Sequence, residues 1–262
     1  MTRMIAALLC APVGMAAFAA EEVVTIPTRS GVTVSYLLVQ YQAATAKIVV
    51  ISFIGGYGSI PLPENRAPTF EATANFVVRI RDQLADADIA DAIVDAPSDN
   101  PHRMADTFRL GPEHLADMRA LIADVKKRFV NAKVILLGTS RGTVSTAALA
   151  AKLGDSVQGA ILTSTATSSD RMGAALSRFD FTTIKVPVLL VHHRYDGCVT
   201  SPYLGARRLA KYFPLVSVSG GGLSGTDPCE PLSPHGFYGR EAPVVQAMKD
   251  WMLGREFARD IR

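Results

Sequence analysis

One serine in this sequence stands in a setting that could make it a nucleophile. Gly138-Thr139-Ser140-Arg141-Gly142 follows the apolar run 134–137 and precedes an alanine-rich segment. A G-x-S-x-G pentapeptide between a strand and a helix is typical of a sharp turn that exposes the serine hydroxyl, with glycines where side chains would collide with backbone. The pattern predicts that Ser140 attacks a carbonyl carbon, and that the backbone N–H of Arg141 helps to bind the resulting oxyanion.

Such a serine needs a base, and a histidine follows it at the required place. In this topology the chain order is serine, acid, histidine. His235, in the loop 233–237 before the last helical pattern, follows the serine and any acid on a later strand. The other histidines are His102, His114, His192 and His193. We predict that His235 is the base, and that the pair 192–193 is structural, because adjacent strand residues point to opposite faces and no third metal ligand has suitable spacing.

The acid that orients the base should lie just beyond a later strand. Asp196 follows the apolar run 188–191 and precedes Gly197, so it stands at a strand's carboxyl end with a tight turn behind it. Competing carboxylates are Asp170, Asp227 and Glu230. We predict Asp196 as the acid of a Ser140, Asp196, His235 triad.

A second oxyanion donor is expected in the glycine-rich loop 53–59. Its glycines would let backbone amides approach a ligand closely, although a simple turn has the same composition. The donor is predicted to be the N–H of Gly56 or of Tyr57, and the register stays open.

The N-terminus has the pattern of a secretory signal peptide. Arg3 precedes the apolar run 4–18, which is shorter than the ~20 residues of a membrane span, and Ala17 and Ala19 suit cleavage after residue 19. We expect 1–19 to be removed and 20–262 to form one domain, exported to the periplasm or the extracellular space. No other run approaches a membrane span.

Cleavage would remove Cys10 and leave two cysteines. Cys198 lies two residues after the predicted acid, and Cys229 lies six residues before the predicted base. An oxidising compartment favours one disulfide between them over two buried thiols. The bridge would then join the Asp196 loop to the His235 loop.

The elements that must position these residues alternate between strands and helices. Polar and apolar residues alternate over 23–39 around Arg29-Ser30-Gly31, which predicts an antiparallel hairpin. Later apolar runs without alternation predict buried parallel strands at 47–54, 89–94, 134–137, 160–163 and 188–191, with 215–219 near an edge. Helical patterns cover 70–84, 112–129, 142–153, 202–212 and 242–253. The fold class is α/β, with a mostly parallel central sheet flanked by helices.

Composition and charge exclude several kinds of function. The net charge of +3 comes from 27 Lys and Arg against 24 Asp and Glu, without a basic block, so no nucleic-acid partner is expected. The segment Gly220-Gly221-Gly222 lacks the spacing of a nucleotide site. No cofactor or metal is predicted, and the oligomeric state stays open.

The serine turn, the later aspartate, the last histidine and the glycine-rich loop together resemble the α/β-hydrolase superfamily, most nearly secreted bacterial serine hydrolases of esterase or dienelactone-hydrolase-like type. Dienelactone hydrolases have Cys where this chain has Ser140, and the His-Gly-Gly-Gly signature of some esterases is replaced by Ile54-Gly55-Gly56-Tyr57. The resemblance implies hydrolysis of a small-molecule carboxylic ester through an acyl-enzyme. Alternatives are a peptidase or amidase with the same triad, or a non-catalytic binding protein. Only 165–185 is available as a lid, so no large cap domain is expected.

Overall fold

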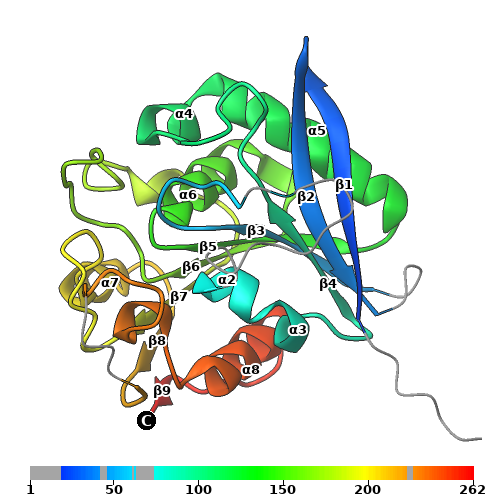
Figure 1. Ribbon diagram of the computed structural model, residues 1–262. Coiled ribbons are helices and arrows are strands. Elements are labelled where there is room, and N and C mark those ends of the chain that lie inside the picture. Colours follow the sequence, from blue (N-terminus) through cyan, green and yellow to red (C-terminus); the bar gives the residue numbers. More distant parts are fainter. Residues whose placement is uncertain (1–18, 42–45, 61, 63–73, 223–226) are drawn as a thin grey trace, which may run out of the picture.

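The computed structural model describes residues 19–41, 46–60, 62, 74–222 and 227–262 (Figure 1). The predicted signal peptide, apart from its last residue Ala19, lies outside these ranges. So does the beginning, 70–73, of one predicted helix.

The described residues form one sheet of nine strands in the order β1-β2-β4-β3-β5-β6-β7-β8-β9. The hairpin of β1 and β2 is antiparallel, and β2 is antiparallel to β4, whereas every pair from β4 to β9 is parallel. The strands are β1 (Ala20–Arg29), β2 (Val32–Gln40), β3 (Ile48–Phe53), β4 (Ile89–Val94), β5 (Lys133–Thr139), β6 (Gly159–Thr163), β7 (Val188–His193), β8 (Leu215–Val218) and β9 (Asp260–Ile261).

Helices cover both faces of this sheet (Figure 1). One face carries α5 (Pro112–Arg128) and α6 (Gly142–Lys152), and the other carries α2 (Phe76–Arg79), α3 (Arg81–Leu84) and α8 (Glu241–Met252). The remaining helices are α4 (Asp106–Leu110) and α7 (Tyr203–Leu209), with the 3₁₀ turns η1 (Gly154–Ser156), η2 (Phe181–Thr183) and η3 (Pro234–Gly236). This is the α/β architecture that the alternating patterns predicted.

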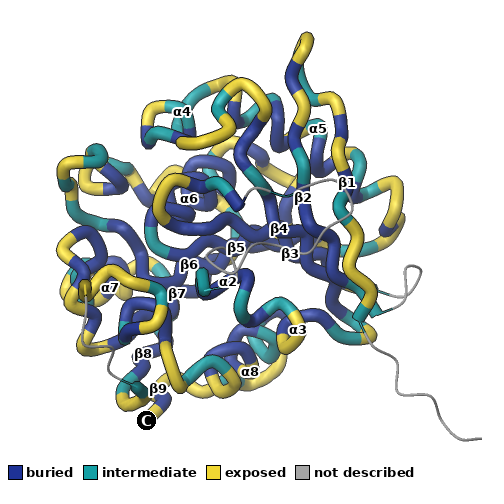
Figure 2. The backbone as a smooth tube through the Cα atoms, in the orientation of Figure 1, coloured by how far each residue is buried: buried dark blue, intermediate teal, exposed yellow. Residues whose placement is uncertain are grey.

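The central strands are buried on both sides because their side chains supply both cores (Figure 2). In β3, Val49 and Ile51 join the core under α5 and α6, whereas Ile48 and Val50 join the core under α2, α3 and α8. Alternation of side chains across a strand produces this division, which explains why the sequence of β3 is apolar without interruption.

The helices differ from the predictions mainly at their ends. Within its described part, the predicted helix 70–84 is divided into α2 and α3. Ile80 lies between them, as the C-cap of α2 and the N-cap of α3. The predicted helix 202–212 ends earlier, at Leu209. The short elements α4 and β9 were not predicted because five and two residues are too few to show a period. The prediction that 215–219 lies near an edge is confirmed, because only β9 lies beyond β8 at this end of the sheet that the described residues form.

Among the residues that the structure describes, no large cap covers the carboxyl ends of the strands. In the fully described stretch between β6 and β7, the 3₁₀ turn η2 and an isolated bridge between Asp170 and Gly173 are the only regular structures. Among the described residues, no helix has the length and apolar character needed to cross a membrane.

Candidate active site

Ser140 lies in a strained turn between β5 and α6. Its φ of 51° is in the left-handed region, which costs about 1–3 kcal/mol for a residue with a side chain. The Ser140 N–H donates to the carbonyl of Thr163 at 3.0 Å, and its own carbonyl accepts from the Thr143 N–H at 2.9 Å, so both neighbours hold the turn. The strain points to function, because a relaxed residue would serve a merely structural turn equally well.

The two glycines of the pentapeptide are required by crowding, as the sequence predicted. A Cβ on Gly138 would lie 2.6 Å from the carbonyl oxygen of Gly142. A Cβ on Gly142 would lie 2.8 Å from the carbonyl oxygen of Ile54 and closer still to that of Phe53. The turn therefore packs directly against the end of β3, which brings the glycine-rich loop 53–59 to the serine.

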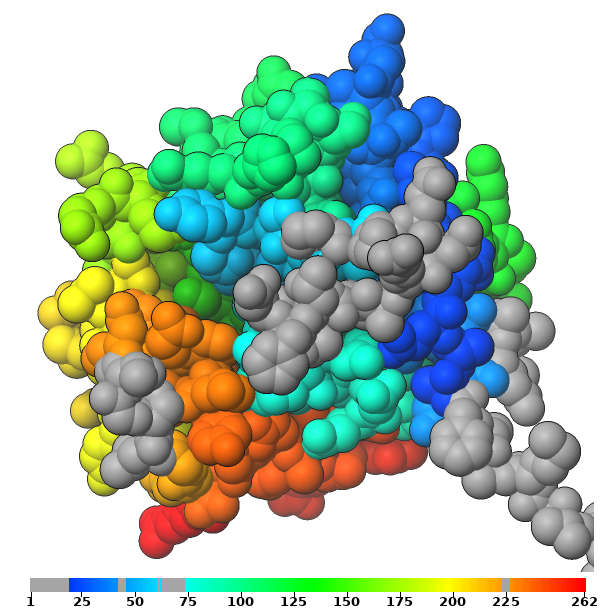
Figure 3. All heavy atoms as spheres, viewed as in Figure 1, coloured from blue at the N-terminus to red at the C-terminus, as the bar shows by residue number. Residues whose placement is uncertain are grey.

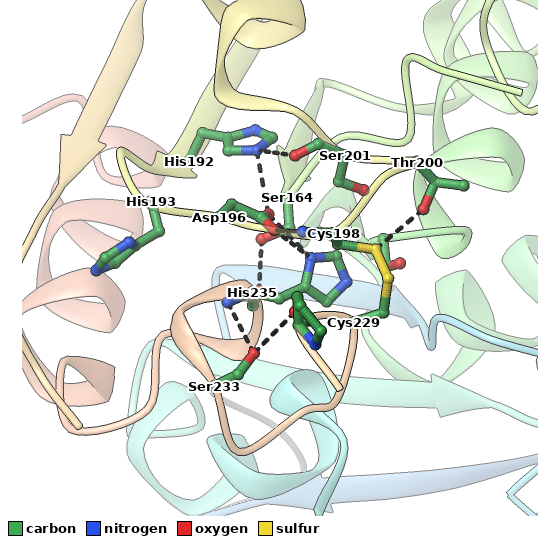
Figure 4. A network of polar contacts seen from close by, with 12 residues as sticks. Ser164, His192, His193, Asp196, Cys198, Thr200, Ser201, Cys229, Ser233 and His235 are labelled. Atoms are coloured by element: carbon green, nitrogen blue, oxygen red, sulfur yellow. Dashed lines mark hydrogen bonds and ion pairs between the residues drawn. A yellow bond between two sulfur atoms is a disulfide. The ribbon is translucent and has the colours of Figure 1, made fainter. Parts of the chain in front are cut away.

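His235 and Asp196 form a buried pair (Figure 4). Asp196 follows β7, and His235 lies in η3, which the Ser233 side chain caps by accepting the His235 N–H at 3.1 Å. His235 Nδ1 lies 2.9 Å from Asp196 Oδ2 and 3.1 Å from Oδ1. The Ser164 hydroxyl donates to the His235 carbonyl at 2.6 Å and fixes its backbone. The competing carboxylates are not bonded to His235: Asp170 pairs with Arg141, and Asp227 accepts the Cys229 N–H.

The Asp196 carboxylate is held as an anion. Burial raises its pKa, but the charge of His235 and hydrogen bonds from His192 and His235 outweigh burial and lower the pKa to about 2. Its Oδ1 also accepts the Cys198 N–H at 2.9 Å. An ionised carboxylate only accepts hydrogen bonds, so His235 Nδ1 carries a hydrogen, and in the neutral form of the ring the other nitrogen, Nε2, has the lone pair.

Ser140 and His235 line one cavity of about 170 Å³, together with Gly55 and Gly56. A second cavity of about 590 Å³ also reaches Ser140 and Gly56, and extends over residues 169–172, 197–200 and 227–229. In the space-filling view the light-blue turn after β3, the yellow-green segment after β6 and the orange segment that carries η3 meet on one face (Figure 3). The reactive groups therefore face a shared space at the carboxyl ends of the strands.

The loop after β3 brings free backbone donors to Ser140. A Cβ on Gly55 would lie 2.9 Å from Ser140 Cβ, so only glycine allows this approach. Within the described parts of the chain, the N–H groups of Gly56, Tyr57 and Arg141 have no hydrogen-bond acceptor. Gly56 lines both cavities, and the Tyr57 side chain is 54% exposed. The sequence predicted the loop but no role for Gly55, because that role depends on a contact between distant segments.

The Arg141 side chain has a role that the sequence did not reveal. It is buried and pairs with Asp106 at 2.6 Å and with Asp170. Burial lowers its pKa, but hydrogen bonds to these two carboxylates raise it above its usual value. Asp106 Oδ2 also accepts the Ala175 N–H at 2.8 Å. Arg141 thus ties the serine turn to the segment after β6.

The structure contains the disulfide between Cys198 and Cys229. Cys198 lies on the Asp196 loop, and Cys229 lies on the loop that leads into η3 (Figure 4). Both cysteines line the larger cavity. The bridge connects the two segments that carry the acid and the histidine.

No metal centre is found among the described residues, where no group of three or more His, Cys, Asp and Glu side chains could hold an ion. His192 and His193 point to different sides of β7 (Figure 4). His193 Nε2 donates to the Gly220 carbonyl at 2.9 Å, and its Nδ1 accepts the Tyr195 N–H at 3.1 Å. Burial is the main reason that the pKa of His193 is lowered.

Comparison with known proteins gives a family match and a set of structural neighbours. A family model described as serine aminopeptidase, S33, matches residues 98–194, a part that includes Ser140 and ends before Asp196. No curated protein matches the sequence.

Solved structures share the fold at low identity. Est1E from Butyrivibrio proteoclasticus is 16% identical, with a TM-score of 0.63 over 89% of this chain and 98% of that chain. A dienelactone hydrolase from Anabaena variabilis is 18% identical, with a TM-score of 0.61 over 90% and 98%. A serine hydrolase without lid from Xanthomonas campestris is 14% identical, with a TM-score of 0.55 over 90% and 96%.

The sheet order and these similarities show that the chain has the α/β-hydrolase fold, without a large cap among its described residues. The serine turn lies within the part that the serine aminopeptidase family model matches. The structural neighbours include a dienelactone hydrolase, and a second structure of Est1E holds bound ferulic acid.

Proposed function

We propose that this protein hydrolyses carboxylic esters of small molecules through an acyl-enzyme on Ser140. The observation that carries the proposal is that a strained serine lines the same cavity as a histidine whose Nδ1 is paired with a buried aspartate. Each of the three groups has a distinct part in acyl transfer.

In the acylation step, Ser140 Oγ forms a bond to the ester carbonyl carbon while its proton passes to His235 Nε2. Asp196 holds Nδ1–H and stabilises the imidazolium. The N–H of Arg141, with that of Gly56 or Tyr57, donates a hydrogen bond to the oxyanion, because these donors have no other acceptor among the described residues. The intermediate then collapses: the bond to the alcohol oxygen breaks, and His235 returns the proton to the leaving alcohol.

Deacylation repeats the sequence with water. His235 Nε2 removes a proton from water, the hydroxide oxygen bonds to the acyl carbon, and the Ser140 oxygen leaves with the proton that His235 returns. The products are the free acid and the regenerated serine.

The site is open enough for substrates of more than one size. The larger cavity of about 590 Å³ lies within the range of small-molecule sites. The dienelactone hydrolase and the ferulic acid complex of Est1E, both of which share this fold, support a search among lactones and aromatic esters first.

A fluorophosphonate probe tests the nucleophile directly. Purified protein with its disulfide intact should be labelled, and Ser140→Ala and His235→Ala should not be. Ser169→Ala is a matched control, because Ser169 is an exposed serine of the larger cavity and should not affect labelling. Labelling that survives Ser140→Ala, or a folded wild type that is not labelled, would overturn the proposal.

A second candidate, an aminopeptidase or amidase with the same triad, is favoured by the description of the matching family model. The two candidate functions are distinguished by comparing the hydrolysis of an aminoacyl anilide with that of the phenyl ester of the same amino acid. We expect the kcat/KM for the ester to exceed that for the amide, and the reverse order would favour a peptidase.

We also propose that the protein is exported, with cleavage after Ala19. The support is the N-terminal apolar run and the disulfide, since disulfides persist in oxidising compartments. N-terminal sequencing of the exported product should begin at Ala20.

A further inference from the structure

A second histidine contacts the acid of the proposed triad. His192 is the second-last residue of β7, has 0% exposed surface, and approaches Asp196 from the side opposite His235 (Figure 4). Its Nε2 lies 3.2 Å from Asp196 Oδ2, the same oxygen that accepts from His235 Nδ1. Two imidazoles therefore share one carboxylate oxygen.

The surroundings of His192 fix which ring nitrogen carries its hydrogen. Nε2 lies 2.8 Å from the Ser201 carbonyl oxygen, and a carbonyl only accepts hydrogen bonds. Nε2 is therefore the N–H nitrogen, shared between Ser201 and Asp196. Nδ1 is buried and has no hydrogen-bond partner within the described part of the chain. A buried nitrogen without a partner is destabilising, so an apolar side chain would serve packing alone at least as well.

We propose that His192 is a positioning residue, which fixes the Asp196 carboxylate for His235 and takes up part of its charge. The inference rests on the proposed function, because it assigns His192 a role in the same triad. His192 does not touch the reacting atoms and acts through Asp196.

The proposal predicts a change in the pH profile. With the His192 donor removed, more of the Asp196 charge is available to His235, so the imidazolium persists to higher pH. The acid limb of kcat/KM should then move upward. The ionisable groups facing Asp196 are His235 from η3, His192 from β7 and, at longer range, His193. Tyr203 of α7 packs against His192, with the two ring centroids 6.0 Å apart. Cys198 and Cys229 do not titrate because they form a disulfide.

Three variants test this. His192→Phe keeps a ring and removes the donor, and His192→Gln keeps an N–H near the position of Nε2. His193→Phe is the matched control, because it is the neighbouring buried histidine, and its hydrogen bonds go to Gly220 and Tyr195 rather than to Asp196. We expect His192→Phe to lower kcat by roughly tenfold with little change in KM, and to raise the acid limb by roughly half a unit. His192→Gln should restore most of the lost kcat and return the acid limb most of the way to its wild-type position. His193→Phe should leave the acid limb unchanged.

The pH midpoint of the His235 imidazole titration, followed by NMR in the wild type and in the same variants, gives a readout that needs no substrate. It should rise in His192→Phe and return toward the wild-type value in His192→Gln. A midpoint that stays unchanged or falls in His192→Phe would overturn the proposal. A lower kcat together with a lower Tm, but without a shift of the acid limb, would also overturn it. A wild type that does not react with the fluorophosphonate probe would count against the proposed function, whereas the NMR midpoints would still decide the role of His192.

Discussion

Asp91, in the central sheet, and Asp196, in the loop after β7, are both buried aspartates, and their surroundings shift their pKa values in opposite directions. Asp91, in the middle of β4, has 0% exposed surface and accepts one hydrogen bond, from the Ser52 hydroxyl at 2.6 Å. Its Oδ2 has no partner among the described residues. Asp196, beyond the end of β7, contacts two imidazoles and one backbone N–H. Burial raises the pKa of Asp91 to about 7, whereas the partners of Asp196 lower its pKa to about 2.

The comparison shows that burial alone does not make a carboxylate functional. Desolvation raises the pKa in both places, and only a sufficient set of donors and positive charge reverses it. For Asp91, the Ser52 hydrogen bond and the charge of Arg81 lower the pKa less than burial raises it. Asp196 is an anion at neutral pH because it lies beyond the end of β7, where two imidazoles and a backbone N–H reach its carboxylate. Asp91 lies within β4, where only the Ser52 hydroxyl donates to its carboxylate among the described residues.

The largest expected effect is a difference in catalytic activity between variants of Asp196 and of Asp91. Asp196→Asn should lower kcat by about 10⁴-fold, because an amide in this place favours the wrong tautomer of His235. Asp91→Asn should leave kcat within about twofold, because Asp91 lines neither cavity that reaches Ser140. Steady-state kinetics on the ester with the best rate for the wild type would measure both.

Equal losses in the two variants would contradict this distinction and indicate a common effect on folding. Circular dichroism and the Tm of each variant provide the control. Asp196→Asn should remain folded, since the amide occupies nearly the same volume as the carboxylate.

A smaller effect is expected from removal of the disulfide, because the bridge holds the loop of Asp196 and does not hold the strand of Asp91. Asp196 lies in a loop, whereas β4 is paired with β2 and β3 along its length. Cys198→Ala combined with Cys229→Ala opens a link between residues 31 apart, so in the chain-entropy model the free energy of unfolding should fall by about 3–4 kcal/mol. Denaturant unfolding would measure this loss.

Hydrogen exchange would then locate the loss. Amides of the segment 196–200 should exchange faster in the double variant, while those of β4 should keep their relative protection. Reduced wild-type protein should behave like the double variant. Equal acceleration in β4 would show that the bridge stabilises the whole domain and not the Asp196 loop in particular.

The fold was largely predictable, because buried parallel strands and amphipathic helices leave periodic patterns. The runs at 89–94 and 188–191 indicated β4 and β7 within two residues. Short elements such as α4 and β9 left no such pattern. The strand prediction for 89–94 also passed over Asp91, because one polar residue does not disturb an apolar run whose partner, Ser52, lies on another strand.

The candidate site was predictable where a local motif implies geometry, and not where contacts join distant segments. The turn around Ser140 and the bridge between Cys198 and Cys229 are present in the structure as predicted. The catalytic roles of Ser140, Asp196 and His235 stay predictions that the labelling experiment tests. The contact of His192 with Asp196 was missed, because it depends on the turn after β7, where the Asp196 N–H donates to the His193 carbonyl at 3.2 Å.

The smallest expected effect concerns Asp91 and appears only as a dependence of stability on pH. In the unfolded chain an aspartate loses its proton near pH 4, whereas folded Asp91 keeps it up to about pH 7. Between these values folding takes up a proton, so the stability that neutral Asp91 provides is complete below pH 4 and is lost as the pH rises toward 7. The loss should approach about 1.4 kcal/mol per pH unit in this window.

Asp91→Asn removes the titration and keeps the shape, so the difference in free energy of unfolding between wild type and variant isolates it from all other groups. We expect the wild type to lose about 2–3 kcal/mol relative to Asp91→Asn between pH 5 and 7, measured by urea unfolding at several pH values. A constant difference would mean that Asp91 is ionised throughout, and that Ser52 and Arg81 hold it as an anion. In that case the two aspartates would differ in their partners but not in their charge.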